Sequence, residues 1–123
     1  MKKKRLLTNR AIDFDTSDLG YMHMVIPDHT QQAMTHYLVK GWEPGGFLTA
    51  MLAMDMPRAI NSADTANRQT MWSIGRWIMT RCPADAWGSY QAVESWINDQ
   101  DGRRSAFAEE YEKNQVWLTL VKE

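Results

Sequence analysis

Two groups of residues in this chain of 123 have types and spacings suited to a phosphorylated ligand, and the first is the turn Pro44-Gly45-Gly46. An apolar stretch with helical spacing follows this turn directly. Glycine lets an incoming group approach the backbone closely, and the first amide groups of a helix have no partner within it, so an anion such as phosphate is favoured there. The sequence lacks the longer phosphate-loop pattern with its lysine and Ser/Thr. We therefore interpret the turn either as an anion site or as a tight connection between two helices.

The second group is a row of arginine and tryptophan at helical spacing. Arg68, Trp72 and Arg76 are four residues apart, so on a helix they lie beside one another. An exposed indole between two guanidinium groups could stack a base and hold its phosphates. Arginines also lie over tryptophans simply to cover them from water, and Trp77 and Arg81 form a second pair of this kind. Both interpretations remain open from the sequence.

Two polar residues, Asp64 and Asn67, fall on the apolar side of the helix expected over residues 64–81. Polar groups on a side that faces the core need hydrogen-bond partners. Either Asp64 caps the helix and Asn67 bonds the glycine turn, or both residues line a pocket. Together with neighbours of the two groups above, they give a candidate ligand site of nine residues: Trp42, Gly45, Gly46, Thr49, Asp64, Asn67, Arg68, Trp72 and Arg76.

The sequence offers little for catalysis or metal binding. His29 and His36 are seven residues apart, whereas zinc-binding helices usually place ligands four residues apart, and no third ligand is evident. The single cysteine, Cys82, belongs to the apolar side of its helix, where packing is the expected role. Asp55 and Asp64 could form a metal-dependent phosphodiesterase site with a histidine, but no nucleophile or paired-carboxylate motif stands out. We expect a protein that is not an enzyme and uses no metal or cofactor.

Helices must position these residues. Ala, Leu and Met together number 29, against 11 for Val and Ile, and apolar residues recur at helical spacing along most of the chain. The expected helices cover approximately residues 28–40, 47–52, 55–63, 64–81, 89–97 and 101–121. We predict an all-α fold, a compact single-domain bundle of five to six short helices over residues 27–123. A basic, partly ordered N-terminal arm over residues 1–26 precedes it.

Capping residues mark several helix boundaries. Asp28, with Gln31 three residues later, has the pattern of a capping box at the start of the first helix, and Gly41 suits its end. Asp55 and Ser89 stand where the third and fifth helices are expected to begin. These residues predict short connections between successive helices.

Charge and composition exclude several classes of protein. Fourteen Lys and Arg against 15 Asp and Glu leave a formal charge of −1, and the pI is near 6.3, so a nucleic-acid partner and a polybasic membrane contact are disfavoured. No apolar run approaches the roughly 18 residues that cross a bilayer. One cysteine cannot form an internal disulfide, and the basic start lacks the apolar stretch of a secretory signal. We expect a soluble protein of a reducing compartment.

Large apolar side chains are numerous, with six tryptophans and nine methionines. A small domain buries only some of them, so we expect Trp42, Trp72, Trp87 and one of Trp96 and Trp117 to stay partly exposed. Tryptophan and methionine are enriched at interfaces, which favours a binding protein and a homo-oligomer. The alternative is that these side chains fill an irregular helical core.

A string of residues between positions 26 and 96 resembles a group of small, uncharacterised bacteriophage proteins. The string comprises Ile26-Pro27-Asp28-His29, Ala33, Tyr37, Gly41, Pro44-Gly45-Gly46-Phe47-Leu48-Thr49-Ala50, Leu52, Asp55, Ala63-Asp64, Asn67-Arg68 and Trp87-Gly88-Ser89. It covers a little over half of the chain and implies no catalytic residues. The resemblance implies a phage-encoded accessory protein in the bacterial host cytoplasm, and phage genes of this size often counter host defences.

Three functions follow as hypotheses. The first is a non-enzymatic phage protein that antagonises host defence by sequestering a small phosphorylated signal, such as a cyclic nucleotide, between two or more subunits at the nine candidate residues. The second is an inhibitor that covers a host defence or regulatory protein, as anti-CRISPR proteins do, with exposed Trp and Met as its anchors. The third is a helical DNA-binding module with residues 64–81 in the major groove, which the acidic balance of the chain disfavours.

Overall fold

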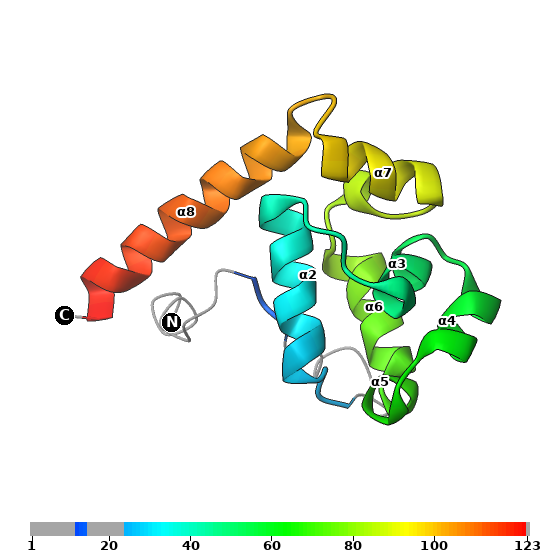
Figure 1. Ribbon diagram of the computed structural model, residues 1–123. Coiled ribbons are helices and arrows are strands. Elements are labelled where there is room, and N and C mark those ends of the chain that lie inside the picture. Colours follow the sequence, from blue (N-terminus) through cyan, green and yellow to red (C-terminus); the bar gives the residue numbers. More distant parts are fainter. Residues whose placement is uncertain (1–11, 15–23, 123) are drawn as a thin grey trace.

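Seven α-helices and one 3₁₀ helix make up the described part of the chain (Figure 1). The computed structural model describes residues 12–14 and 24–122, and the side chains of residues 12–14 and 24–113. No strand occurs in these ranges, so the predicted all-α, single-domain fold is confirmed. The elements are α2 (Asp28–Lys40), α3 (Gly46–Leu52), α4 (Met56–Ser62), α5 (Thr65–Gln69), α6 (Met71–Arg81), η2 (Ala84–Ala86), α7 (Tyr90–Asn98) and α8 (Arg103–Lys122).

Helix α2 ends as predicted but begins differently. Gly41 follows it in the left-handed conformation, with φ of 72°, which glycine adopts without strain. The capping box predicted at its start is wrong, because Pro27 occupies the N-cap position and its carbonyl oxygen already accepts the backbone N–H of Gln31 at 3.0 Å. Asp28 therefore lies inside the helix. The Gln31 amide group donates instead to the carbonyl oxygen of Ile26, at 2.8 Å.

The single helix predicted over residues 64–81 is two helices, which raises the number of α-helices in the described ranges above the expected six. The break is at Thr70, whose φ of −114° and ψ of 14° are not helical. Its hydroxyl donates to the carbonyl oxygen of Ala66 at 2.9 Å. Such a bond from a threonine side chain competes with the helical backbone pattern, so α5 stops one residue before Thr70 and α6 starts one residue after it.

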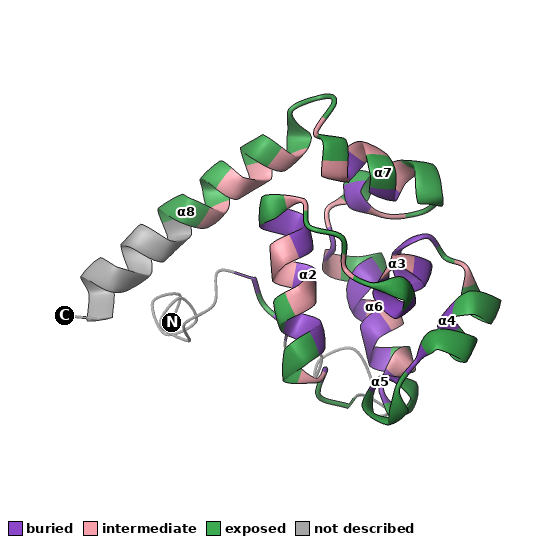
Figure 2. Cartoon of the chain, in the orientation of Figure 1, coloured by how far each residue is buried: buried purple, intermediate pink, exposed green. Residues whose placement is uncertain are grey.

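The core lies between α2, α3, α6 and α7, where Figure 2 shows the buried residues in purple. Tyr37 of α2 is fully buried, and its hydroxyl donates to the carbonyl oxygen of Ala86 at 2.7 Å, so its polar end is satisfied. Burial raises the pKa of the Tyr37 hydroxyl far above its usual value. The indole N–H of Trp96 on α7 donates to the carbonyl oxygen of Tyr37 at 3.3 Å, which joins α7 to α2.

Part of the predicted N-terminal arm belongs to this core. Ile12 and Phe14 are buried, and the ring of Phe14 stacks on Trp77 of α6 with centroids 4.8 Å apart. The indole N–H of Trp77 donates to the carbonyl oxygen of Asp13 at 2.7 Å. Trp77 is therefore a core residue, not a surface indole covered by Arg81. The rest of the arm up to residue 23 lies outside the described residues.

Candidate functional site

The nine residues predicted to form a ligand site fall into three local groups. Trp42 lies beside α2, where its ring packs against His36 with centroids 4.6 Å apart and the Nζ of Lys40 lies 5.2 Å from the indole centroid. Gly45, Gly46 and Thr49 form the turn into α3. The remaining five residues lie on α5, α6 and the connection before them: Asp64, Asn67, Arg68, Trp72 and Arg76.

At the glycine turn, the neighbouring cation is Arg58 of α4, a residue outside the prediction. A Cβ atom built on Gly46 would lie 3.7 Å from the Nη2 of Arg58. Gly45 and Gly46 are exposed, and Gly45 has a φ of 90°. Arg68 and Arg76, the two arginines expected to serve this turn, instead contact Ala63 and Trp72. Among the described residues, no hydrogen bond or ring contact joins the turn to either arginine.

Arg58 is held by a cluster that joins α4 to the start of α7. Its Nη1 donates to the hydroxyl of Tyr90 at 2.9 Å, and that hydroxyl donates to Oδ2 of Asp55 at 2.5 Å. The bond from Tyr90, together with the backbone N–H of Arg58, lowers the pKa of the Asp55 carboxyl. The same hydroxyl raises the pKa of Arg58. Because the three side chains satisfy one another, the positive charge of Arg58 beside the glycine turn is already partly compensated.

Asp64 and Asn67 have structural partners. Oδ1 of Asp64 accepts the backbone N–H of Asn67 at 2.7 Å, which confirms the predicted cap, and its Oδ2 lies 3.2 Å from Nε2 of His29. Asn67 is buried, and its Oδ1 accepts the hydroxyl of Thr30 at 2.5 Å. The predicted bond from Asn67 to the glycine turn is therefore replaced by one to α2. Both residues fasten the N-terminus of α5 to the first turn of α2.

One side of α6 presents large side chains to solvent. Trp72 is 46% exposed and Met79 is 49% exposed, and they are seven residues apart, so they lie on the same side of the helix. Arg76 stands between them, with its Cζ 5.9 Å from the centroid of the Trp72 ring. Its Nε is buried and has no hydrogen-bond partner among the described residues, and its guanidinium lies beside the indole. We call Trp72, Arg76 and Met79 the α6 face.

The exposure of the other tryptophans agrees with the sequence in part. Trp42 is 54% exposed and Trp87 is half-buried, as predicted. Trp96 is buried, and Trp117 lies among the residues whose side chains the structure does not describe. Among these tryptophans, Trp72 shares one helix face with a second large exposed side chain.

Comparison with known proteins identifies no relative of this chain. No family model matches the chain, and neither the curated proteins nor the solved structures that were searched include a similar one. The resemblance to bacteriophage proteins stays a prediction.

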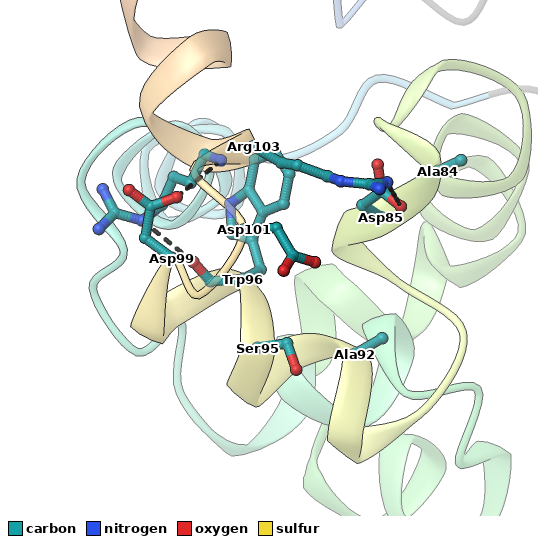
Figure 3. Close-up of a pocket in the computed structure, with 9 residues that line it drawn as sticks. Ala84, Asp85, Ala92, Ser95, Trp96, Asp99, Asp101 and Arg103 are labelled. Atoms are coloured by element: carbon teal, nitrogen blue, oxygen red, sulfur yellow. Dashed lines mark hydrogen bonds and ion pairs between the residues drawn. The ribbon is translucent and has the colours of Figure 1, made fainter.

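A hollow of about 260 Å³ lies where η2, α7 and the start of α8 meet (Figure 3). Helical spacing does not predict this hollow, because its walls come from segments separated by turns. Nη1 of Arg103 lies 2.6 Å from Oδ1 of Asp85 across its rim, and this carboxylate raises the pKa of Arg103. Arg104 donates to backbone carbonyl oxygens, including that of Trp96 at 3.1 Å. Arg103 and Arg104, the two cations that line the hollow, therefore already have partners within the chain.

Two features bear on chemistry in the described ranges: the state of Cys82 and the grouping of residue types that bind metals. Cys82 is buried, and burial raises its pKa to about 12, so its thiolate is scarce at neutral pH. In the ranges with described side chains, no three His, Cys, Asp or Glu residues are close enough together to hold a metal ion. Nor is any helix within the described ranges both long and apolar enough to cross a membrane.

Proposed function

We propose that this chain is a non-enzymatic binding protein that acts by covering another protein with its α6 face. The observation that carries the proposal is the pairing of two large, half-exposed apolar side chains, Trp72 and Met79, on one side of one helix with Arg76 between them. Tryptophan, methionine and arginine are the residue types enriched at protein interfaces.

The free energy gained by burying Trp72 and Met79 is large enough for these side chains to anchor a protein complex. Covering the exposed parts of Trp72 and Met79 removes on the order of 200 Å² of apolar surface from water, or about 5 kcal/mol before the costs of association. Single exposed apolar residues are common on protein surfaces and need no explanation. Two on the same helix face, beside a guanidinium already packed on the indole, are the arrangement expected of an interface centre.

The contacts give less support to a small phosphorylated ligand. The glycine turn has Arg58 as its cation, and that guanidinium already contacts Tyr90. Arg68 donates to the carbonyl oxygen of Ala63 at 3.0 Å. Sequestration of a cyclic nucleotide remains the competing proposal.

The sequence resemblance supplies the expected setting. If the chain is a phage accessory protein, the partner is a protein of the bacterial host, the location is the host cytoplasm, and the biological role is antagonism of host defence. A homo-oligomer that uses the same face would be the alternative occupant.

The test compares two matched tryptophan variants. Trp42 and Trp72 are both about half exposed, and both lie under a cation, Lys40 or Arg76. The tagged chain is purified from bacterial cells, and its complexes are weighed by native mass spectrometry. We expect a stoichiometric protein partner with the natural chain and with Trp42→Ala, but not with Trp72→Ala, and protection of α6 from hydrogen exchange in the complex. Retention of a small molecule in place of a protein, or equal loss with both variants, would contradict the proposal.

A further inference from the structure

We infer that the partner surface that fits the α6 face is acidic: a protein surface that places at least one carboxylate beside an apolar depression. This inference rests on the proposed function and specifies the chemistry of the partner. It depends on the charge of the α5–α6 segment and on the contacts of Arg76.

The segment that forms this face is locally basic in an acidic chain. Between Asp64 and Asp85 the sequence has no Asp or Glu, whereas α5 carries Arg68 and α6 carries Arg76, although the formal charge of the whole chain is −1. The carboxylate at the near end, that of Asp64, accepts the backbone N–H of Asn67 and faces His29. The carboxylate at the far end, that of Asp85, is paired with Arg103. Both of these carboxylates therefore already have partners of their own.

Arg76 differs from the other arginines with described contacts. Arg58, Arg103 and Arg104 bond a tyrosine hydroxyl, a carboxylate and backbone carbonyls respectively. Arg76 has the indole of Trp72 as its neighbour, and no hydrogen-bond acceptor for it occurs among the described residues. Its guanidinium thus lies beside the half-exposed indole of Trp72, with no anionic partner in the described part of the chain.

Covering Trp72 must also remove water from Arg76, because the two groups are in contact. Desolvation of a cation is unfavourable unless the new surface supplies an acceptor, and a planar carboxylate matches a guanidinium with two parallel hydrogen bonds. An apolar or basic partner surface would therefore lose affinity at Arg76. A partner with a carboxylate at this position would gain both affinity and orientation.

A protein fits this face better than a nucleic acid. Binding to a phosphate backbone depends on several cations in a row, whereas the α6 face has one cation, Arg76, between two apolar side chains. Met79 offers an apolar contact at the opposite end of the face from Trp72. These features match a carboxylate-bearing apolar surface, and nucleic acid becomes one outcome of the test.

The test uses defined probes and the full chain. Nuclear magnetic resonance follows the indole N–H signals, with that of Trp72 assigned by its absence in Trp72→Phe and that of buried Trp77 as an internal reference. The probes are an amphipathic helical peptide of leucine and glutamate, its leucine–lysine counterpart, and an oligo-dT strand. We expect the Trp72 signal to shift with the glutamate peptide alone, and the shift to shrink at high salt.

Two matched arginine variants test whether Arg76 is the cation that binds the glutamate peptide. Arg76→Gln should weaken binding of the glutamate peptide about tenfold, the effect of losing one charge-assisted pair. Arg103→Gln, whose arginine is already paired with Asp85, should leave it unchanged. No Trp72 shift with the glutamate peptide, an equal shift with the lysine peptide, or a shift with oligo-dT would each overturn the inference. An equal shift with both peptides would do so while leaving α6 as a protein-binding face, which separates this failure from that of the proposed function.

Discussion

The guanidinium of Arg104 occupies the space that a side chain at residue 41 would need. A Cβ atom built on Gly41 would lie 2.7 Å from the Nε of Arg104, which is closer than such atoms approach in folded proteins. Arg104 is fixed there because it donates to the carbonyl oxygens of Val39 and Trp96, each at 3.1 Å. One side chain of α8 thus closes the C-terminal ends of α2 and α7, where the helix dipoles favour a cation.

Gly41→Ala should therefore destabilise the fold more than a glycine substitution elsewhere. We expect a loss of about 2–3 kcal/mol in the free energy of unfolding, from the left-handed backbone and the collision with Arg104 together. Gly45→Ala is the control, since Gly45 also has positive φ but a Cβ there would meet nothing within 4 Å. Urea unfolding measures the loss in the free energy of unfolding for both variants. Equal losses would show that Arg104 does not hold this space.

The cluster of Asp55 and Tyr90 predicts a pH-dependent contribution to stability. The pKa of Asp55 is lowered in the folded state, chiefly by the hydroxyl of Tyr90, so this contribution is present above the usual carboxyl value of 3.8 and is lost as the pH falls through the folded value. Tyr90→Phe should lower the urea midpoint at pH 7, and the difference from the natural chain should shrink at an acidic pH, below the lowered folded pKa of Asp55. A difference that is the same at both pH values would contradict this role.

Cys82 should be inert while the chain is folded. It is buried and its pKa is raised to about 12, so thiol reagents should label it slowly in the native protein and rapidly in concentrated guanidinium chloride. Mass spectrometry of the labelled chain follows the reaction. Fast labelling of the native protein at neutral pH would mean that the thiol is accessible and reopen a chemical role for it.

Truncation of the two tryptophans on α6 should reduce stability by very different amounts. Trp77→Ala removes a buried side chain stacked on Phe14 and should cost about 3–5 kcal/mol of stability. Trp72→Ala removes a half-exposed one and should cost less than about 1 kcal/mol. Thermal or urea unfolding of the two variants decides. A large loss with Trp72→Ala would make it a structural residue and weaken its assignment to a binding face.

Helix boundaries could be predicted where the signal is local. Gly41 and Ser89 act at the ends they mark, because a left-handed backbone or a capping hydroxyl needs no distant partner. The capping box at Asp28 failed because Pro27 had already supplied the first carbonyl acceptor. The break at Thr70 has no signal in the apolar spacing, which continues through it.

The site was harder to predict because its contacts are long-range. The spacing of Trp72 and Arg76 was enough to place them side by side, but exposure depends on what the rest of the fold covers. Trp77 follows Arg76 directly on the same helix, yet it is buried because Asp13 and Phe14, 64 and 63 residues earlier in the chain, contact it. The pairing of Arg58 with Tyr90 likewise joins α4 to α7, and helical periodicity carries no information about it.

Site-specific photo-crosslinking tests the central claim most directly. A photoreactive phenylalanine analogue replaces Met79, which keeps Trp72 in place, in one version of the chain and Trp42 in another, and each is irradiated inside bacterial cells. The account predicts a discrete covalent adduct with a second protein from position 79 and none from position 42. Adducts from position 42 alone, or an absence of protein adducts from both positions, would contradict it.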